Sequence, residues 1–270
     1  MSILMAAFLG LVQGISEFLP ISSSGHLSII QNIFGGDSPS NHLFFDVLLH
    51  VGTLVAVCIF YWTDIRAMAV DTIGFISGKK EDTGESGRLK PTVRSVFMVI
   101  VGTLPLFIVL PVNGYVEQLY YNTPFISFTL IVTGLLLFVS GKLSEGRKNE
   151  KTSSMADALI VGIAQAVATV PGLSRSGTTI TVGLARGFRR DFAVKFSFLL
   201  SIPAILGSTI VTLFDAIGEG IIWAEVPAYL VGMVIAGVVG YFSLKLLKRI
   251  VVADAFGKFA YYCWGAGIVS

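Results

Sequence analysis

Six long runs of apolar residues constrain the fold of this chain more than any other feature. They cover residues 44 to 62, 95 to 112, 124 to 141, 194 to 214, 227 to 244 and 256 to 270. A run of about 20 apolar residues spans the hydrocarbon core of a bilayer, where backbone groups find partners only within helices or closed barrels. Since only 13% of the residues are charged, we predict an all-α polytopic membrane protein with six transmembrane helices.

Two further apolar stretches are interrupted. Residues 3 to 19 and 27 to 35 are separated by Pro20 and a run of serines, and residues 156 to 187 are broken in a similar way. Interrupted helices occur at membrane depth where their irregular backbone lines a cavity or is buried in protein. We therefore predict two re-entrant helix-loop-helix pairs. For the first stretch, the alternative is one ordinary spanning helix followed by a surface loop.

The two interrupted stretches carry related sequences. Residues 10 to 26 read GLVQGISEFLPISSSGH, and residues 162 to 178 read GIAQAVATVPGLSRSGT. The copies share their first and last glycines and the flanking serines. They differ in chemistry, because the first supplies a carboxylate, a hydroxyl and an imidazole where the second supplies a guanidinium and two threonines. The differing pairs are Glu17 with Thr169, Ser23 with Arg175, and His26 with Thr178.

Charge along the chain predicts an orientation for these segments. Lys and Arg gather in the connections at 64 to 94, 142 to 151, 186 to 195 and 245 to 249, and are absent from 35 to 43, 113 to 123 and 215 to 226. Lys and Arg mark the cytoplasmic side. Each half then holds one broken pair and three spans, and this odd number inverts the second half. We predict a single membrane domain, 1 to 270, with repeat one at 1 to 141, a polar cytoplasmic linker at 142 to 155, and an inverted repeat two at 156 to 270.

The first interrupted stretch contains the strongest single candidate for a functional residue, Glu17. Gln13 and Glu17 are four residues apart and share a helix face, and a carboxylate at membrane depth is costly enough to suggest a site by default. Ser22, Ser23, Ser24 and Gly25 precede the next short helix, whose N-terminus would favour an anion. The alternative is a purely structural carboxylate with capping serines.

Arg175 is the corresponding candidate in the second stretch. Arginine suits bidentate recognition of phosphate, and a group of small polar residues surrounds it: Ser174, Ser176, Gly177, Thr178 and Thr179. The alternative is an ion pair between Arg175 and Glu17. The combined groups fit a phosphorylated compound presented within or beside the bilayer. Asp46 and His50 either line the same cavity or hydrogen-bond to neighbouring helices.

Small residues in the apolar segments predict close helix packing. The glycines concerned are Gly10, Gly14, Gly102, Gly134, Gly162, Gly232, Gly237 and Gly240.

The motifs QGISEFLPISSSGH and PGLSRSGTT resemble the two signatures of the undecaprenyl pyrophosphate phosphatases, integral-membrane bacitracin-resistance proteins of bacteria. The similarity extends over essentially the whole chain. It implies hydrolysis of the C55 isoprenyl diphosphate to the monophosphate and inorganic phosphate, which recycles the lipid carrier for peptidoglycan synthesis. It further implies a place in the bacterial cytoplasmic (inner) membrane, with the active site facing outside.

The resemblance also implies roles for individual residues. The catalytic group is Glu17, Ser23, His26 and Arg175. The substrate-binding group is Gln13, Ser22, Ser24, Gly25, Ser174, Ser176, Gly177, Thr178 and Thr179. A divalent cation, Mg²⁺ or Ca²⁺, would rest on Glu17, diphosphate oxygens and water. Because some relatives have glutamate at position 13 where this chain has glutamine, a mechanism with two carboxylates from this helix is in doubt.

Ser23 is the candidate nucleophile, with Glu17 or His26 as its base; attack by a water that either residue activates is the alternative. A transporter or flippase of a phosphorylated lipid or small anion is the competing functional class, because inverted repeats with broken helices are a transporter plan. A structural membrane subunit is a third. We expect a polyprenyl diphosphate lipid and the membrane as partners and allow for a homodimer. The formal charge of +2 does not argue for nucleic acid.

Overall fold

The structure is a computed structural model of the chain, described here for residues 1–34, 40–78, 89–219 and 222–270. Every regular element in these ranges is a helix. Four of the helices are long and apolar enough to cross a membrane, and a bent pair formed by Phe44–Phe60 and Trp62–Ile76 adds a fifth if it counts as one span. The chain is therefore an all-helical, multi-pass membrane protein, while the number of six spans stays a prediction.

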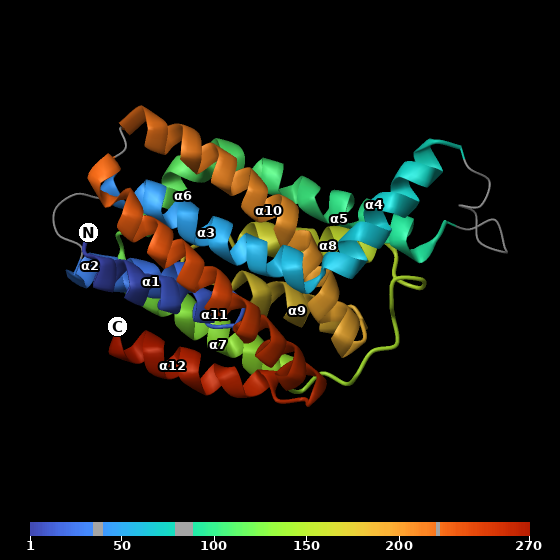
Figure 1. The fold of residues 1–270 in the computed structure, drawn as a ribbon. Helices are drawn as coiled ribbons and strands as arrows, with labels where there is room; N and C mark the ends of the chain where they lie inside the picture. Colours follow the sequence, from blue (N-terminus) through green and yellow to red (C-terminus); the bar gives the residue numbers. More distant parts are fainter. Residues whose placement is uncertain (35–39, 79–88, 220–221) are drawn as a thin grey trace.

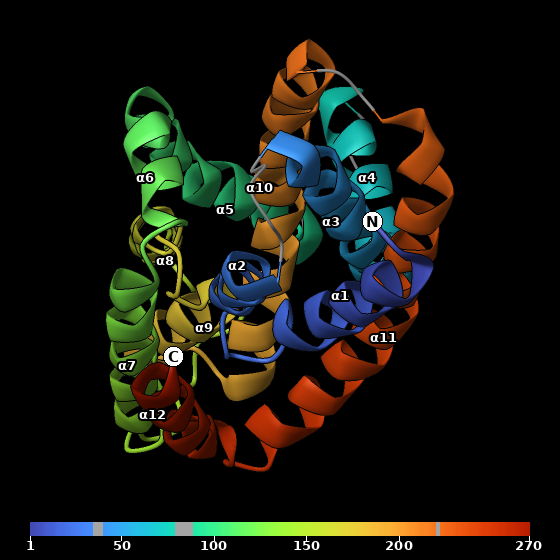
Figure 2. The same cartoon turned by 90° about the vertical axis from the view of Figure 1, so that its left-hand side faces the viewer.

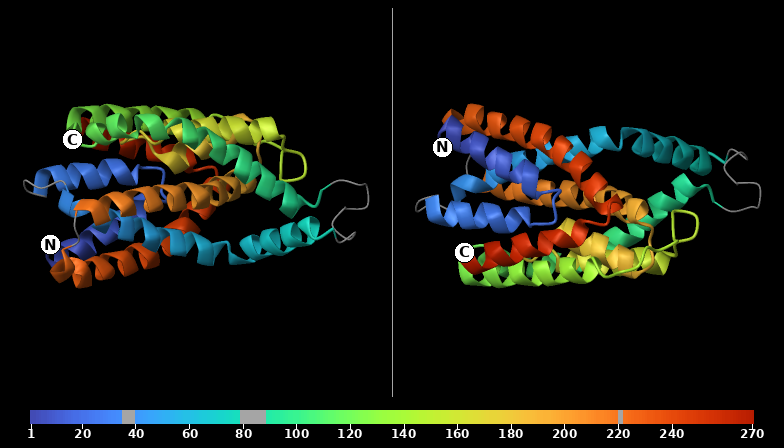
Figure 3. Two further views of the ribbon diagram at one scale, coloured as in Figure 1. Left: turned by 90° about the horizontal axis from the view of Figure 1, so that it is seen from above. Right: turned by 90° about the horizontal axis from the view of Figure 1, so that it is seen from below.

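Both interrupted stretches form pairs of short helices. The first pair is α1 (Ile3–Ser16) and α2 (Ser23–Phe34), and the second is α8 (Met155–Val167) and α9 (Arg175–Ala185). The connecting loops are inside the protein, since Ser22 and Ser174 are each only 2% exposed. A surface loop after α1 is thus excluded. The pairs open toward opposite ends of the molecule, and their loops lie near its middle (Figure 3).

The remaining long helices surround these pairs. They are α3 (Ser40–Phe60), α5 (Pro91–Thr103), α7 (Thr123–Ser140), α10 (Arg190–Glu219), α11 (Val226–Val252) and α12 (Phe259–Val269). Viewed from one end, α2 and α9 lie near the centre of the bundle with longer helices around them (Figure 2). α10 and α11 run past the predicted ends of their spans, whereas α12 has only 11 residues and follows a 3-10 turn at Phe256–Lys258.

Two segments predicted as connections contain helices. α4 (Trp62–Ile76) occupies the start of the stretch at 64 to 94 and is bent by 76° from the helix before it, and α6 (Asn113–Leu119) lies in the stretch at 113 to 123. In α4 the polar residues have partners on neighbouring helices: Asp64 pairs with Lys195 at 2.5 Å, and Asp71 accepts a hydrogen bond from Thr92 at 2.5 Å. The polar residues of this stretch therefore did not exclude a helix, because its two aspartates have partners on other helices.

The basic and acidic connections separate to opposite ends of the molecule. α4, the linker at 142 to 154 and the end of α11 lie at one end, whereas α6 and both chain termini lie at the other (Figure 1). This is the segregation that the distribution of Lys and Arg predicted.

Glycines allow the first helix of each broken pair to pack closely on the other half of the chain. α1 packs along α11, and α8 packs on α5. A β-carbon on Gly10 would lie 2.4 Å from the carbonyl oxygen of Gly232, and one on Gly162 would lie 2.1 Å from that of Gly102. At each of the eight glycines predicted at helix contacts, an added β-carbon would lie in close contact with an atom of a neighbouring element. That prediction is therefore confirmed. The two halves of the chain are interlocked.

Candidate active site

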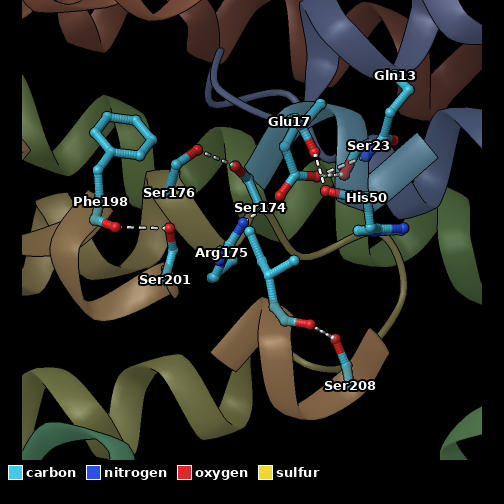
Figure 4. A network of polar contacts seen from close by, with 12 residues as sticks. Gln13, Glu17, Ser23, His50, Ser174, Arg175, Ser176, Phe198, Ser201 and Ser208 are labelled. Atoms are coloured by element: carbon cyan, nitrogen blue, oxygen red, sulfur yellow. Dashed lines mark hydrogen bonds and ion pairs between the residues drawn. The ribbon is translucent and has the colours of Figure 1, made fainter. Parts of the chain in front are cut away.

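Three of the predicted site residues meet around the carboxylate of a fourth, Glu17 (Figure 4). Ser23 Oγ donates a hydrogen bond to Glu17 Oε2 at 2.6 Å, and Gln13 Nε2 donates to the same oxygen at 3.2 Å. The guanidinium of Arg175 forms an ion pair with Glu17 Oε1. Since Glu17 is 6% exposed, this is a buried carboxylate with both oxygens engaged by groups from α1, α2 and α9.

The end of α1 fixes the position of Glu17. The amide of Glu17 donates to the Gln13 carbonyl at 2.9 Å, which completes the last turn of the helix. The next side chain, Phe18, is fully buried and meets Phe198 of α10 edge to face, with ring centroids 5.6 Å apart. Because Phe18 is held by aromatic packing, Glu17 has little freedom to turn away from the loop that follows.

Ser23 is the first residue of α2, and its neighbours form a compact cap. Ser22 Oγ accepts a hydrogen bond from the Gly25 amide at 3.2 Å and lies 3.2 Å from Ser24 Oγ. The first amides of a helix have no acceptor within the helix, and the helix dipole favours an anion at this end. The start of α2 therefore offers donors beside the nucleophile candidate.

Arg175, which matches Ser23 in the repeat, is likewise the first residue of its helix, α9. Ser174 Oγ accepts from the Gly177 amide at 3.1 Å and lies 3.3 Å from Ser176 Oγ. The cap of α2 is thus reproduced, bond for bond, at the start of α9. Two helix N-termini, one carrying a hydroxyl and the other a guanidinium, converge on Glu17.

Two threonines of α7, which the sequence did not single out, hold the loop before α9. Thr133 Oγ1 accepts from the Ser174 amide at 3.1 Å and donates to the Gly172 carbonyl at 2.9 Å, while Thr129 Oγ1 donates to the Pro171 carbonyl at 2.6 Å. Gly172 has φ of +87°, and a β-carbon there would lie 1.9 Å from Thr129 Oγ1. In the sequence, the two threonines stand out as two hydroxyl residues four positions apart within an apolar run.

Three predicted residues lie apart from the Glu17 network. The ring nitrogens of His26 contact the Ser22 carbonyl and the Tyr262 hydroxyl, each at 2.8 Å. Thr179 Oγ1 donates to the Arg175 carbonyl at 2.8 Å and lies 2.5 Å from Ser197 Oγ, so it supports α9 from behind. Thr178 Oγ1 is buried without a hydrogen-bond partner among the described residues.

His50 and Tyr120 border the network. His50 lies beside Glu17 (Figure 4), and its ring Nδ1 is 2.8 Å from the Asp46 carbonyl of its own helix. The Asp46 side chain accepts a hydrogen bond from Gln31 at 3.0 Å. Tyr120, at the end of α6, has a side-chain hydrogen bond with Ser24. Burial, reinforced by nearby carboxylates, raises the pKa of Tyr120 to about 12, so the phenol remains protonated. No sequence pattern pointed to Tyr120.

The oxygen atoms around Glu17 fit a divalent cation only with help from a substrate. Within the described ranges, no three His, Cys, Asp or Glu residues cluster as metal ligands. Gln13 Oε1, however, is buried and has no hydrogen-bond partner among these residues, and it lies next to the Glu17 carboxylate. Mg²⁺ and Ca²⁺ prefer oxygen ligands, and Mg²⁺ commonly keeps substrate phosphates and waters. One carboxylate and one amide oxygen therefore suit such an ion when a phosphorylated substrate supplies the rest.

Comparison with known proteins identifies the family. The family model described as "Bacitracin resistance protein BacA" matches residues 6–269. The chain belongs to this family. An undecaprenyl-diphosphatase of Halothermothrix orenii is 39% identical over 270 residues, covering 100% of this chain and 97% of the relative. An undecaprenyl-diphosphatase of Methanobrevibacter smithii is 40% identical over 272 residues, covering 100% of this chain and 96% of the relative. The matched range contains Glu17, the three groups that contact it and the loops of both broken helix pairs.

Proposed function

We propose that this chain hydrolyses undecaprenyl diphosphate to undecaprenyl phosphate and inorganic phosphate. One observation carries the proposal: a buried carboxylate accepts a hydrogen bond from Ser23 at 2.6 Å and also pairs with Arg175. A hydroxyl activated by a carboxylate and a guanidinium suited to phosphate are the parts that phosphoryl transfer needs. The relatives named undecaprenyl-diphosphatase support the choice of substrate.

Substrate binding in this proposal depends on the two helix N-termini. The diphosphate draws Arg175 from Glu17 and accepts hydrogen bonds from the first amides of α2 and α9, while the prenyl tail stays along apolar helix surface. Charge stabilisation by donors fixed before the reaction is commonly the largest contribution to catalysis. Ser22 and Ser174, which hold the two caps, keep those donors in place.

In the chemical step, Ser23 Oγ attacks the terminal phosphorus and transfers its proton to Glu17. The bond from that phosphorus to the bridging oxygen breaks, and undecaprenyl phosphate leaves with the bond's electron pair. Glu17 then releases this proton to the departing phosphate or to solvent. Water attacks the phosphoserine and gives a proton to Glu17, the bond from phosphorus to Ser23 Oγ breaks, and Ser23 takes the proton back as inorganic phosphate leaves. Direct attack on the diphosphate by a water that Glu17 activates is the alternative. Glu17 is the preferred base because Ser23 donates to it, whereas His26 faces Ser22 and Tyr262.

A divalent cation, Mg²⁺ or Ca²⁺, is part of the proposal. Glu17 and Gln13 Oε1 would hold it together with diphosphate oxygens, and it would neutralise charge on the substrate. Removal of the ion by a chelator should lower turnover, and added Mg²⁺ or Ca²⁺ should restore it.

The finer topology is also proposed. Repeat one spans 1 to 141, repeat two spans 156 to 270 in inverted orientation, and the linker 142 to 155 lies in the cytoplasm. The opposite opening of the two helix pairs (Figure 3) supports this arrangement. We place the protein in the bacterial inner membrane with the active site facing outside, because the α1–α2 pair opens toward the end that lacks basic connections. The homodimer and the lack of a nucleic-acid partner stay predictions, which cross-linking in membranes and a binding assay would test.

The test is phosphate release by the purified protein in detergent, using undecaprenyl diphosphate with and without chelator. Wild-type protein should release phosphate, and Glu17→Ala, Ser23→Ala and Arg175→Ala should not, with Asp191→Asn at an exposed ion pair as the control. Binding of the lipid without turnover would favour a transporter or flippase. Turnover that persists in Ser23→Ala but not in Glu17→Ala would assign the attack to water.

A further inference from the structure

Ser22, the residue before the nucleophile candidate, has a backbone conformation that serine rarely adopts. Its φ is +70°, and it is one of only two non-glycine residues with positive φ among those described. The left-handed region costs an L-residue roughly 1–2 kcal/mol, because the β-carbon approaches the carbonyl oxygen. Such a residue persists only where its surroundings hold it. Ser22 is also buried, so its surroundings identify what holds it.

His26 is the residue that holds Ser22. The Ser22 carbonyl accepts two hydrogen bonds from it, one from the His26 amide at 3.2 Å and one from ring Nδ1 at 2.8 Å. Because a carbonyl oxygen only accepts, Nδ1 must carry a hydrogen. In the neutral ring, Nε2 is then an acceptor.

Tyr262 of α12 occupies that acceptor. Its hydroxyl lies 2.8 Å from His26 Nε2 and donates to it. The two rings are also stacked, with centroids 5.7 Å apart and planes inclined by 15°. Both ring nitrogens of His26 are therefore engaged, and neither faces the hydroxyl of Ser23, which donates to Glu17.

The second half of the chain has neither the strain nor the histidine. Ser174, the match of Ser22, has φ of −72° and ψ of 115°, an ordinary extended conformation. Thr178 replaces His26, and the left-handed turn falls instead on Gly172 with φ of +87°. Glycine adopts this region freely. His26 is therefore present in the copy of the loop in which a serine, and not a glycine, has the left-handed conformation.

We propose that His26 and Tyr262 are positioning residues, which hold Ser22 in its left-handed conformation and so direct Ser23 at Glu17. The inference deepens the proposed function and depends on it. It assigns His26 an action through the backbone of Ser22 and gives Tyr262, at the far end of the chain, a part in the same reaction.

Five variants in the detergent assay test the proposal. His26→Ala should lower kcat about fivefold to thirtyfold, the factor that corresponds to the conformational cost at Ser22, with a smaller change in KM. His26→Asn should recover most of kcat, since its amide nitrogen can replace Nδ1 as donor. Adding Ser22→Asn to His26→Ala should also recover kcat, because asparagine tolerates positive φ and its side-chain oxygen can still accept the Gly25 amide as a helix cap. Tyr262→Phe should lower kcat a fewfold. Tyr261→Phe is the matched control, since that hydroxyl makes no hydrogen bond among the described residues and Tyr261 is 65% exposed.

The result that would overturn the proposal is equally specific. If His26→Asn and the Ser22→Asn, His26→Ala double variant are as inactive as His26→Ala, while all three elute and unfold like wild type in detergent, then His26 takes part in the chemistry itself. Loss of one limb of the kcat against pH profile in His26→Asn would lead to the same conclusion. Failure of the proposed function looks different, because wild-type protein would then release no phosphate from the prenyl diphosphate.

Discussion

The α1–α2 and α8–α9 pairs have the same frame and different chemistry. In both, a serine before the second helix accepts from the amide three residues on and lies beside the hydroxyl of a second serine. At the first residue of the second helix, however, one pair has Ser23 and the other has Arg175. Glu17 contacts both Ser23 and Arg175. Its match in the second pair is Thr169, whose hydroxyl donates a hydrogen bond to the Ala166 carbonyl three residues earlier.

This comparison shows how a repeat can yield an asymmetric site. The shared serines and glycines place two helix ends together, which gives donors for an anion but no reaction. The reactive groups appear only at the positions where the copies diverge. Because the halves interlock, with α1 packed on α11 and α8 on α5, those divergent positions meet at one point, where Glu17 contacts Ser23 and Arg175.

Substitution of Glu17 should have the largest effect, because this residue contacts the divergent position of both helix pairs. Glu17→Gln keeps the shape of the side chain but removes the charge that attracts the Ser23 proton and pairs with Arg175. We expect turnover of undecaprenyl diphosphate to fall by about 10³-fold, the scale seen when a stabilising or proton-accepting group is removed from an active site. Initial rates of phosphate release measure this loss.

A charge exchange separates a site from a structural ion pair. The double variant Glu17→Arg, Arg175→Glu keeps opposite charges at the two positions, so a purely structural pair would tolerate it. We expect the variant to remain folded but inactive, since the carboxylate no longer faces Ser23. Wild-type rates in this variant would contradict the proposed function.

Substitution of the packing glycines tests whether α1 and α8 depend equally on close packing against the other half of the chain. Gly10→Ala and Gly162→Ala each place a methyl group within 2.4 Å of a backbone carbonyl oxygen on the facing helix. Overpacking of this kind costs about 1–3 kcal/mol, so both variants should unfold at lower temperature in detergent. Gly265→Ala is the control, because a β-carbon there meets nothing within 4 Å. A large effect at only one of the two positions would weaken the comparison.

Thr133 sharpens the comparison, because the second loop depends on α7 for its shape. Thr133→Val leaves the Ser174 amide and the Gly172 carbonyl without their partner, and unsatisfied buried groups cost about 1–3 kcal/mol. We expect KM for the lipid to rise about tenfold as Arg175 loses its position. Thr103→Val, whose hydroxyl donates to the Val99 carbonyl of its own helix, should leave KM unchanged.

The matched glutamines should show the smallest effects. Gln13 donates to Glu17, whereas neither amide atom of Gln165 has a hydrogen-bond partner among the described residues although both are buried. Replacing an unsatisfied polar group by an apolar one of similar size can be neutral or stabilising. Gln13→Met should therefore reduce turnover a fewfold, while Gln165→Met should keep it and leave the unfolding temperature equal or higher. Equal losses of activity in both would show that Gln165 has a role in the site.

The sequence by itself determined the class of fold, the two broken helix pairs, the packing glycines, and Glu17 with the three groups that contact it. It could do so because these depend on local quantities: the length of an apolar run, the interruption of a run by proline and serine, and a repeat that can be aligned residue by residue. The helix α4 was missed, since its aspartates have partners far away in the chain, such as Lys195 for Asp64. The helix α6 was missed because it has only seven residues and is too short and polar to form an apolar run.

Only the tertiary structure decided what the candidates do in space. Side chains from three other helices contact the two loops and the helices that follow them: Thr133 from α7, Tyr120 from the end of α6 and Tyr262 from α12. A hydrogen bond between residues 236 positions apart leaves no periodic pattern in a sequence. The same holds for His26, whose identity suggested a base but whose two ring nitrogens are engaged elsewhere. A residue type limits the chemistry that a side chain can perform, whereas the direction in which packing turns it selects among those possibilities.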